Sequence, residues 1–167
     1  MKVKSILLLT LLAACTGCNT PPDTSAQDQT DIKALEDNFA AAFKAKDVNT
    51  IMSFYTPDAT MVVFDVVPPL QYTGADAYRK DWQDTFAAYP GPVDFAISNL
   101  SITTGGNVAF ASSIQHGTLT GKDGKKFDMT ARVTDGYKKV NGHWLIAHEH
   151  ASIPVDLATL KADPNAK

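Results

Sequence analysis

Asp135 and His148 are the two residues whose types and spacing point most clearly to chemistry. The dipeptide Asn141-Gly142 predicts a two-residue hairpin turn, because both of its residues tolerate positive φ angles. Counting back from that turn places Asp135 opposite His148, with Cβ atoms about 5 Å apart. A carboxylate at that distance can orient an imidazole, which then acts as a general acid or base near neutral pH. We therefore take this pair as candidate catalytic residues, with a structural hydrogen-bonded pair as the alternative.

A metal site is a second interpretation of the same strand. His148 and His150 alternate along it, so their side chains share a face with Cβ atoms about 6.6 Å apart, close enough to bind one ion together. Asp135 is the best third ligand, because His116 is expected about 11 Å from His150 in a flat sheet. The ligand set is incomplete. The pattern therefore favours polar residues that line a ligand pocket, and we expect neither a metal nor another cofactor.

The predicted pocket is lined from one face of a sheet and from helices. A second two-residue turn at Asp123-Gly124 sets the register of the preceding strand, and alternation gathers the large apolar residues on one face. Helices should cover that face. The expected pocket-lining residues are Ser112, His116, Tyr137, His150, Ser152, Tyr55, Tyr78 and Trp82, with Asp65 as a further residue at the mouth. Tyr78 and Trp82 belong to an aromatic stripe that is also typical of ordinary core.

The opposite face of the predicted sheet looks like a surface. Alternation places Gln115, Arg132 and Glu149 there, among small residues such as Ala111 and Ala151. We expect an ion pair between Arg132 and Glu149, and a face of this kind suits a dimer interface.

Three helices followed by an antiparallel meander must position these residues. Apolar spacing predicts a first helix capped at residue 30 or 31, a second capped by Asn49, and a third capped by Thr73. Strands are predicted over 60–67, from Val93 to the turn at residue 105, and over 108–120, 127–139 and 144–153. The alternation slips by one residue between Ile97 and Leu100, which predicts a β-bulge. This order predicts an α+β domain with its helices on one face of a bent sheet.

The first 30 residues predict export and a lipid anchor. Lys2 and Lys4 precede an apolar stretch that is shorter than the ~20 residues needed to span a bilayer. Leu12-Ala13-Ala14-Cys15 resembles a bacterial lipobox, which implies a signal peptide over 1–14 and lipidation of Cys15. Cys18 is the second candidate acceptor, and an ordinary cleaved signal peptide is the alternative. Residues 15–30 predict a flexible tether. By the same resemblance, Thr16 after Cys15, in place of an aspartate, implies sorting to the outer membrane, facing the periplasm.

Length and composition limit the remaining classes of protein. With 167 residues, of which 44% are hydrophobic, the chain suffices for one domain with a core. The net charge of −3 and the lack of a basic run beyond the leader exclude a nucleic-acid partner. Cys15 and Cys18 are the only cysteines, so we expect no disulfide within the domain.

Two stretches carry a resemblance to a known family. Residues 68–82 and 132–152, together with 54–59, are similar to SnoaL-like and DUF4440-type members of the NTF2-like, ketosteroid isomerase-like superfamily. The likeness covers 31–156 and leaves 157–167 as a C-terminal tail. It implies a cone in which three N-terminal helices pack on the concave face of a strongly bent antiparallel sheet. The superfamily contains isomerases, cyclases, hydratases and non-enzymatic modules, so the resemblance indicates the fold more than the function.

Two functions fit these observations. The first is an envelope lipoprotein whose pocket binds a small, largely apolar molecule and catalyses isomerisation, hydration or cyclisation by acid/base proton transfer. The second is a non-catalytic dimerising module that supports an envelope protein complex. We expect a homodimer.

Overall fold

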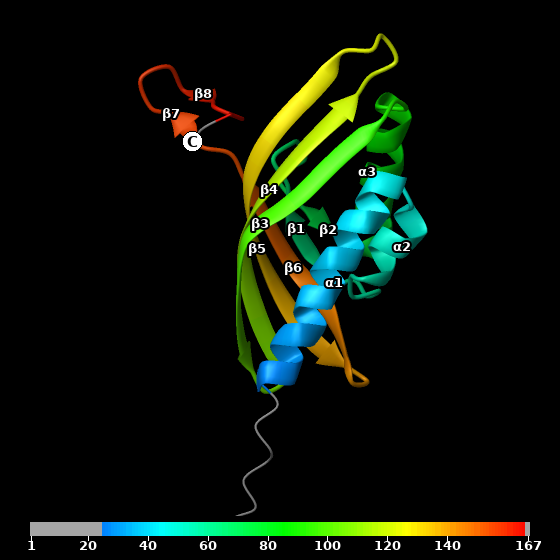
Figure 1. Cartoon of the computed structure of the whole chain (residues 1–167), viewed down its shortest axis with the longest axis vertical. Helices are drawn as coiled ribbons and strands as arrows, with labels where there is room; N and C mark the ends of the chain where they lie inside the picture. Colours follow the sequence, from blue (N-terminus) through cyan, green and yellow to red (C-terminus); the bar gives the residue numbers. More distant parts are fainter. Residues whose placement is uncertain (1–24, 166–167) are drawn as a thin grey trace, which may run out of the picture.

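The computed structural model describes residues 25–165, in which three helices lie on one side of a six-stranded sheet (Figure 1). The sheet order is β2-β1-β6-β5-β4-β3, antiparallel except where β1 lies parallel to β6. The predicted α+β cone is confirmed. No helix in the described part of the chain is long and apolar enough to cross a membrane. The elements are α1 (Ser25–Ala45), α2 (Val48–Ser53), β1 (Val62–Phe64), β2 (Tyr72–Thr73), α3 (Ala75–Ala88), β3 (Val93–Gly105), β4 (Val108–Thr120), β5 (Lys126–Val140), β6 (His143–Ser152), β7 (Val155–Asp156) and β8 (Lys161–Ala162).

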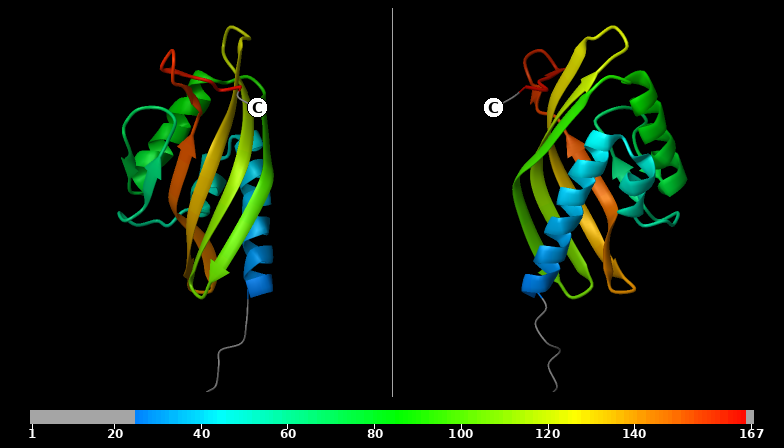
Figure 2. Two further views of the ribbon diagram at one scale, coloured as in Figure 1. Left: turned by 90° about the vertical axis from the view of Figure 1, so that its left-hand side faces the viewer. Right: turned by 45° about the vertical axis from the view of Figure 1, so that its right-hand side comes forward.

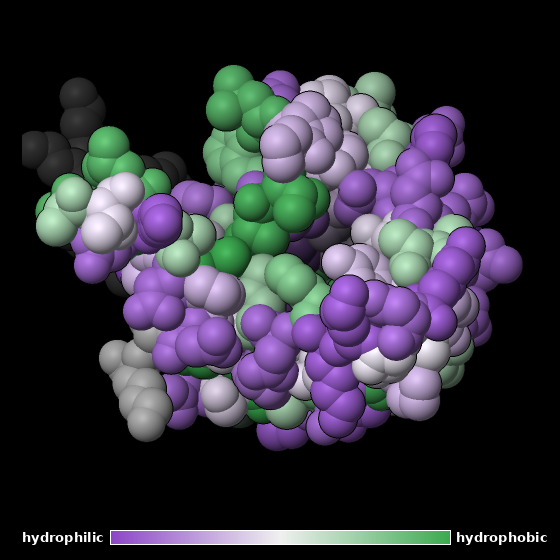
Figure 3. Space-filling model, turned by 90° about the horizontal axis from the view of Figure 1, so that it is seen from above, coloured by the Kyte–Doolittle hydropathy of each residue, from purple (hydrophilic) through white to green (hydrophobic). Residues whose placement is uncertain are grey.

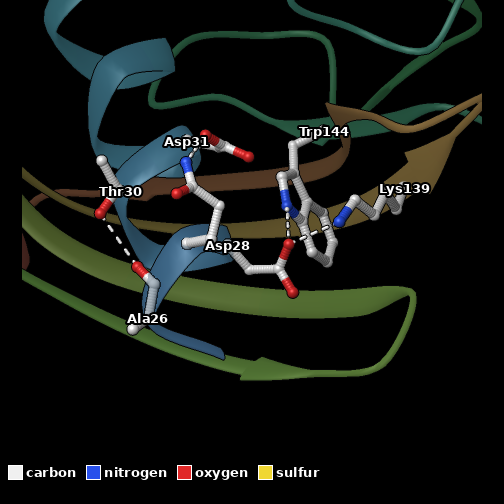
Figure 4. Close-up of polar contacts among 7 residues, drawn as sticks. Ala26, Asp28, Thr30, Asp31, Lys139 and Trp144 are labelled. Carbon is white, nitrogen blue, oxygen red and sulfur yellow. Dashed lines mark hydrogen bonds and ion pairs between the residues drawn. The ribbon is translucent and has the colours of Figure 1, made fainter. Parts of the chain in front are cut away.

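Helix α1 begins at Ser25, earlier than the predicted cap at residue 30 or 31. Asp28 explains the early start, because its buried carboxylate accepts hydrogen bonds from Lys139 Nζ (2.5 Å) and Trp144 Nε1 (3.2 Å) (Figure 4). These contacts attach the first turn of the helix to β5 and β6. Residues 25–30 are therefore helical, and the prediction of a flexible tether is wrong for them. The predicted signal peptide and Cys15 lie outside the described residues.

The caps of α2 and α3 also differ from the prediction. Asp47, rather than Asn49, caps α2 by accepting a hydrogen bond from the backbone N–H of Thr50 (3.1 Å). Gly74 precedes α3 with a φ of +82°, a conformation that favours glycine, and the predicted cap Thr73 instead ends β2. The strand predicted over 60–67 is reduced to the three residues of β1.

An aromatic cluster joins the helices to the sheet. Phe43 of α1 stacks on Phe95 of β3 with ring centroids 4.2 Å apart and meets Trp82 of α3 edge-on at 5.3 Å. Phe86 packs on Trp82 at 5.6 Å, one turn further along α3. Offset and edge-on geometries of this kind stabilise an interface beyond the area that they bury. The core thus lies between the helices and the concave face of the sheet.

One of the two predicted hairpin turns is correct and the other is one residue too short. Asn141 and Gly142 have φ angles of 51° and 84°, so Val140 pairs with His143 as predicted. The β4–β5 loop instead has three residues, 122–124. Gly121 N–H donates to the carbonyl of Lys125 (2.8 Å), and only Gly124 has a positive φ. Every residue of β4 is therefore shifted by one relative to β5.

Two bulges bend the long strands. The bulge predicted in β3 is confirmed between Ser98 and Ser101, where Asn99 has a φ of 52°. The second, in β6, was not predicted: Tyr137 pairs with Ile146, but Gly136 pairs with His148, so Ala147 is an extra residue.

On its other edge, β6 changes its pairing partner at the position of the bulge, and this change accounts for the bulge. Ile146 forms an isolated bridge with Tyr55, whereas His148 already pairs with Val62 of β1. Beyond the bulge, Glu149 faces the helices opposite Asp135. The two histidines that flank Glu149 consequently face away from the helices.

The C-terminal segment forms a small hairpin of β7 and β8 on the side of the sheet away from α1 and α3 (Figure 2). The carbonyl of Pro164 accepts a hydrogen bond from the backbone N–H of Thr130 (2.8 Å), which satisfies a group of β5 beyond the end of β6. The segment predicted as a tail is therefore attached to the sheet.

Candidate functional site

A cavity of about 90 Å³ lies between α3, the end of β1 and the concave face of the sheet. Aliphatic side chains of β4 and β5 form one wall, and three polar residues, Asp65, Gln115 and Glu149, interrupt an otherwise apolar lining. Apolar surface gathers around a hollow at the end of the molecule that carries the β4–β5 hairpin (Figure 3). A mostly apolar cavity with a few polar groups is typical of a small-molecule site. The aromatic residues of the lining are Phe43, Tyr78, Trp82, Phe95 and Phe127.

Glu149 is the most distinctive of the polar groups in this cavity. It is only 8% exposed, and its two carboxyl oxygens accept hydrogen bonds from Tyr55 (2.5 Å to Oε2) and Tyr78 (2.9 Å to Oε1). Burial raises the pKa of Glu149 to about 7, although the two phenol hydrogen bonds act in the opposite direction. Near neutral pH the side chain therefore populates both its protonated and its ionised form, as a general acid or base requires.

Two further carboxyl groups lie behind Glu149, away from the cavity. Asp135 sits directly across from Glu149 on β5 and is 2% exposed, and its Oδ1 has no hydrogen-bond partner among the described residues. Glu36 of α1 accepts a hydrogen bond from the hydroxyl of Tyr137 (2.6 Å). Burial raises the pKa of Asp135 and of Glu36, and the charge of Glu149 raises that of Asp135 further. Burial therefore makes ionisation of both acids less favourable than it is in water.

Asp65 completes the acidic side of the cavity. It follows β1, is half-buried, and accepts a hydrogen bond from the backbone N–H of Val66 (2.5 Å). Burial raises the pKa of Asp65, and the nearby carboxyl of Asp81 adds to that effect. Its position at the cavity agrees with the sequence prediction of a residue at the mouth.

The predicted catalytic pair of Asp135 and His148 does not form. Because of the β6 bulge, His148 lies on the outer face, where its Nδ1 is 2.9 Å from the carbonyl of Val62 and its ring centroid is 5.1 Å from that of Phe64. His150 is exposed on the same face, with its ring 5.7 Å from that of Phe64. Neither histidine can act in the cavity.

Of the other residues predicted to line the pocket, the aromatic ones lie inside and the polar ones of the strands lie outside. Trp82 and Tyr78 line the cavity, Tyr55 is buried beside Glu149, and Tyr137 is buried beside Glu36, behind the cavity. The pocket predictions for Ser112, His116 and Ser152 are wrong. The register shift between β4 and β5 turns Ser112 and His116 outward, and the β6 bulge turns Ser152 outward.

The predicted ion pair between Arg132 and Glu149 is also wrong. Arg132 is exposed on the outer face, whereas Glu149 is buried against Tyr55 and Tyr78.

Glu149 and Gln115 are the polar cavity residues that sequence reasoning placed on the wrong face. A usable signal was present, because alanines lie beside both residues on their own face of the sheet: Ala151 follows Glu149 on β6, and Ala131 pairs with Gln115. A polar side chain among alanines on a strand has empty space beside it, which a cavity requires. Among residues 25–165, no group of three or more His, Cys, Asp and Glu side chains is arranged to hold a metal ion.

Comparison with solved structures defines the class of protein as NTF2-like. An NTF2-like protein of unknown function from Pseudomonas putida KT2440 superposes with a TM-score of 0.77 and 28% identity over 86% of this chain and 98% of that one. A candidate dehydratase of the NTF2-like family from Streptomyces avermitilis gives a TM-score of 0.69 at 17% identity, covering 77% of this chain and 97% of that one. A candidate scytalone dehydratase from Novosphingobium aromaticivorans gives 0.69 at 15% identity, with coverages of 85% and 95%.

The sequence itself identifies the family. A family model of the SnoaL-like domain matches residues 32–156, and the chain belongs to that family. A comparison with functionally curated proteins finds no match.

Proposed function

We propose that the cavity binds a small, largely apolar molecule and exchanges a proton with it through Glu149. The observation that carries this proposal is the buried carboxyl of Glu149, held by Tyr55 and Tyr78 in a cavity whose other walls are mainly apolar. Two structural neighbours are candidate dehydratases, a class of enzyme whose reaction includes proton transfer. This likeness supports the proposal without specifying a substrate.

The geometry gives each group a role in such a step. The ionised carboxylate of Glu149 accepts a proton from the ligand, and the two phenols stabilise the negative charge before the transfer. The aromatic wall keeps bulk water away from the reacting atoms, which strengthens electrostatic interactions there. The volume of about 90 Å³ is smaller than the ~150 Å³ of a cavity that holds benzene. The cavity can therefore enclose only a few heavy atoms of the ligand.

Deuterium exchange of a small ketone tests this proposal. Acetone in D₂O should lose its α-hydrogens faster with the protein than in buffer, as followed by proton NMR, and the rate should rise as the pH passes about 7. Glu149→Gln should lower the protein-dependent rate by roughly 10²-fold or more. Asp128→Asn makes the same acid-to-amide change on the outer face and should leave the rate unchanged, as should His148→Ala. A Glu149→Gln protein as active as the original would overturn the proposal.

We also propose that the protein is a lipoprotein, attached through Cys15 to the outer membrane and facing the periplasm. The support is the lipobox-like Leu12-Ala13-Ala14-Cys15 after a short apolar stretch. Cys15→Ser should move the protein from the membrane fraction to the soluble fraction, whereas Cys18→Ser should not. The reverse result would assign lipidation to Cys18.

A homodimer that supports an envelope complex is the second candidate function. The small residues first taken as its interface face the helices instead, but the outer face exposes Val108 (59%), Phe110 (53%) and Phe64 (37%). Val108 and Phe110 lie two residues apart on the same face of β4, and contiguous exposed apolar surface marks a protein contact more often than a single exposed residue does. Sedimentation of the purified protein should show a dimer that Phe110→Asp dissociates, and a monomer at all concentrations would remove this candidate.

A further inference from the structure

We infer that the ligand of the cavity carries a positively charged amine, which Asp65 and Glu149 hold while its apolar body contacts the aromatic wall. The inference rests on the proposed function, since both concern the same cavity, and it adds the chemical class of the ligand.

The first argument is the unbalanced charge of the cavity. Its lining contains the carboxyl groups of Asp65 and Glu149, and none of the described lining residues is Lys, Arg or His. The titratable groups that act on Glu149 are phenols and carboxyls from every element around it: Glu36 of α1, Tyr55 after α2, Asp65 after β1, Tyr78 of α3 and Asp135 of β5. Within the described part of the chain, the negative charge of ionised Glu149 is therefore balanced by hydrogen bonds alone. A bound cation would be attracted to the carboxylate of Glu149, and an attraction between opposite charges is strong at a buried site.

The second argument is the aromatic wall that faces these acids. The rings of Tyr78 and Trp82 lie 5.5 Å apart and those of Phe43 and Trp82 5.3 Å apart, and all three line the cavity. An alkylammonium group is attracted to aromatic faces, and Trp gives the strongest such interaction. Acidic groups beside several aromatic rings thus match both parts of a small amine, its charge and its hydrocarbon body. An anionic ligand would be repelled by the same carboxylates.

A comparison of n-butylamine with n-butanol tests the inference, because the two probes share their size and differ in charge. Binding to the full chain is measured by NMR titration at pH 5.5 and pH 8.5. Butylamine should bind more tightly than butanol at pH 8.5 and should weaken about tenfold or more at pH 5.5, where Glu149 is mostly protonated. Butanol affinity should change little between the two values.

Two variants locate the binding. Glu149→Gln and Asp65→Asn should each reduce the preference for the amine while leaving butanol binding in place, and Asp65→Asn replaces a side chain that is only half-buried. Asp128→Asn, on the outer face, should keep the preference. Equal binding of both probes, or a preference that survives both cavity variants, would overturn the inference and leave the proposed function standing. Failure of both probes to bind would overturn the cavity as a ligand site, and the proposed function with it.

Discussion

Tyr78 donates its hydroxyl hydrogen to one carboxyl oxygen of Glu149 while Tyr55 donates to the other, and both bonds favour the ionised carboxylate. Tyr78→Phe removes one donor without emptying the site. A hydrogen bond to a charged group contributes about 1.5–3 kcal/mol, so the pKa of Glu149 should rise by about 1 to 2 above its value of about 7. A ¹³C NMR titration of labelled glutamate carboxyls measures the change.

Tyr89→Phe provides the matched control, since this tyrosine caps the end of α3 and donates no hydrogen bond to Glu149. It should leave the titration unchanged. An unchanged or lower pKa of Glu149 in Tyr78→Phe would show that this phenol does not stabilise the carboxylate.

The residue types of the site could be predicted only in part. The aromatic members Tyr55, Tyr78 and Trp82 were found because helical spacing and nearby turns place them reliably inside. Glu149 was placed outside because strict alternation from the Asn141-Gly142 turn ignores the extra residue at Ala147. The bulge arises from a change of neighbour on the other side of β6, which is a tertiary effect.

At the scale of elements, the contact between α1 and the β5–β6 hairpin yields a prediction. Asp28→Asn replaces the carboxylate that binds Lys139 and Trp144 (Figure 4). The loss of a partly buried charged contact should lower the free energy of unfolding by about 1–3 kcal/mol, as measured by urea denaturation. Asp31→Asn, an exposed change on the same helix, should cost far less. Equal losses in the two variants would contradict the role given to Asp28.

The elements themselves were predicted well where turns delimit them. Strand β4 has the predicted bounds, 108–120, because glycines and polar residues mark both of its ends. The β4–β5 loop shows the limit of this approach, since Asp123-Gly124 fits both a two-residue turn and the last two residues of a three-residue loop. The difference of one residue leaves the strand intact and reverses which of its side chains reach the cavity.

At the scale of the whole molecule, the buried acids Glu36, Asp135 and Glu149 predict how stability depends on pH. Burial raises the pKa of each, so the folded chain binds more protons than the unfolded chain. Their contribution to the stability of the folded chain is fully present below the unfolded-state pKa of about 4. It is lost as the pH rises through their folded-state pKa values, and that of Glu149 is about 7. The Tm should therefore fall between pH 5 and pH 8 in thermal unfolding.

Asp135→Asn tests which group is responsible. It replaces a buried acid, whose ionisation burial opposes, by a neutral side chain of the same size, so it should raise the Tm at pH 8 relative to the original chain and flatten the decline. Asp128→Asn on the exposed outer face should change neither feature. A Tm that rises from pH 5 to pH 8 would contradict the assignment of raised pKa values to these acids.

The start of α1 and the cavity lie toward opposite ends of the domain, since α1 begins beside the β5–β6 turn and the cavity lies toward the β4–β5 hairpin (Figure 1). If the chain is anchored ahead of α1, the point of attachment lies at the end of the domain opposite the cavity, and the cavity is reached from the aqueous phase. The ligand would then arrive by diffusion through the periplasm and not by lateral partitioning out of the lipid. Such a route selects for molecules soluble enough to travel in water, a property that a protonated amine gives to an otherwise oily compound.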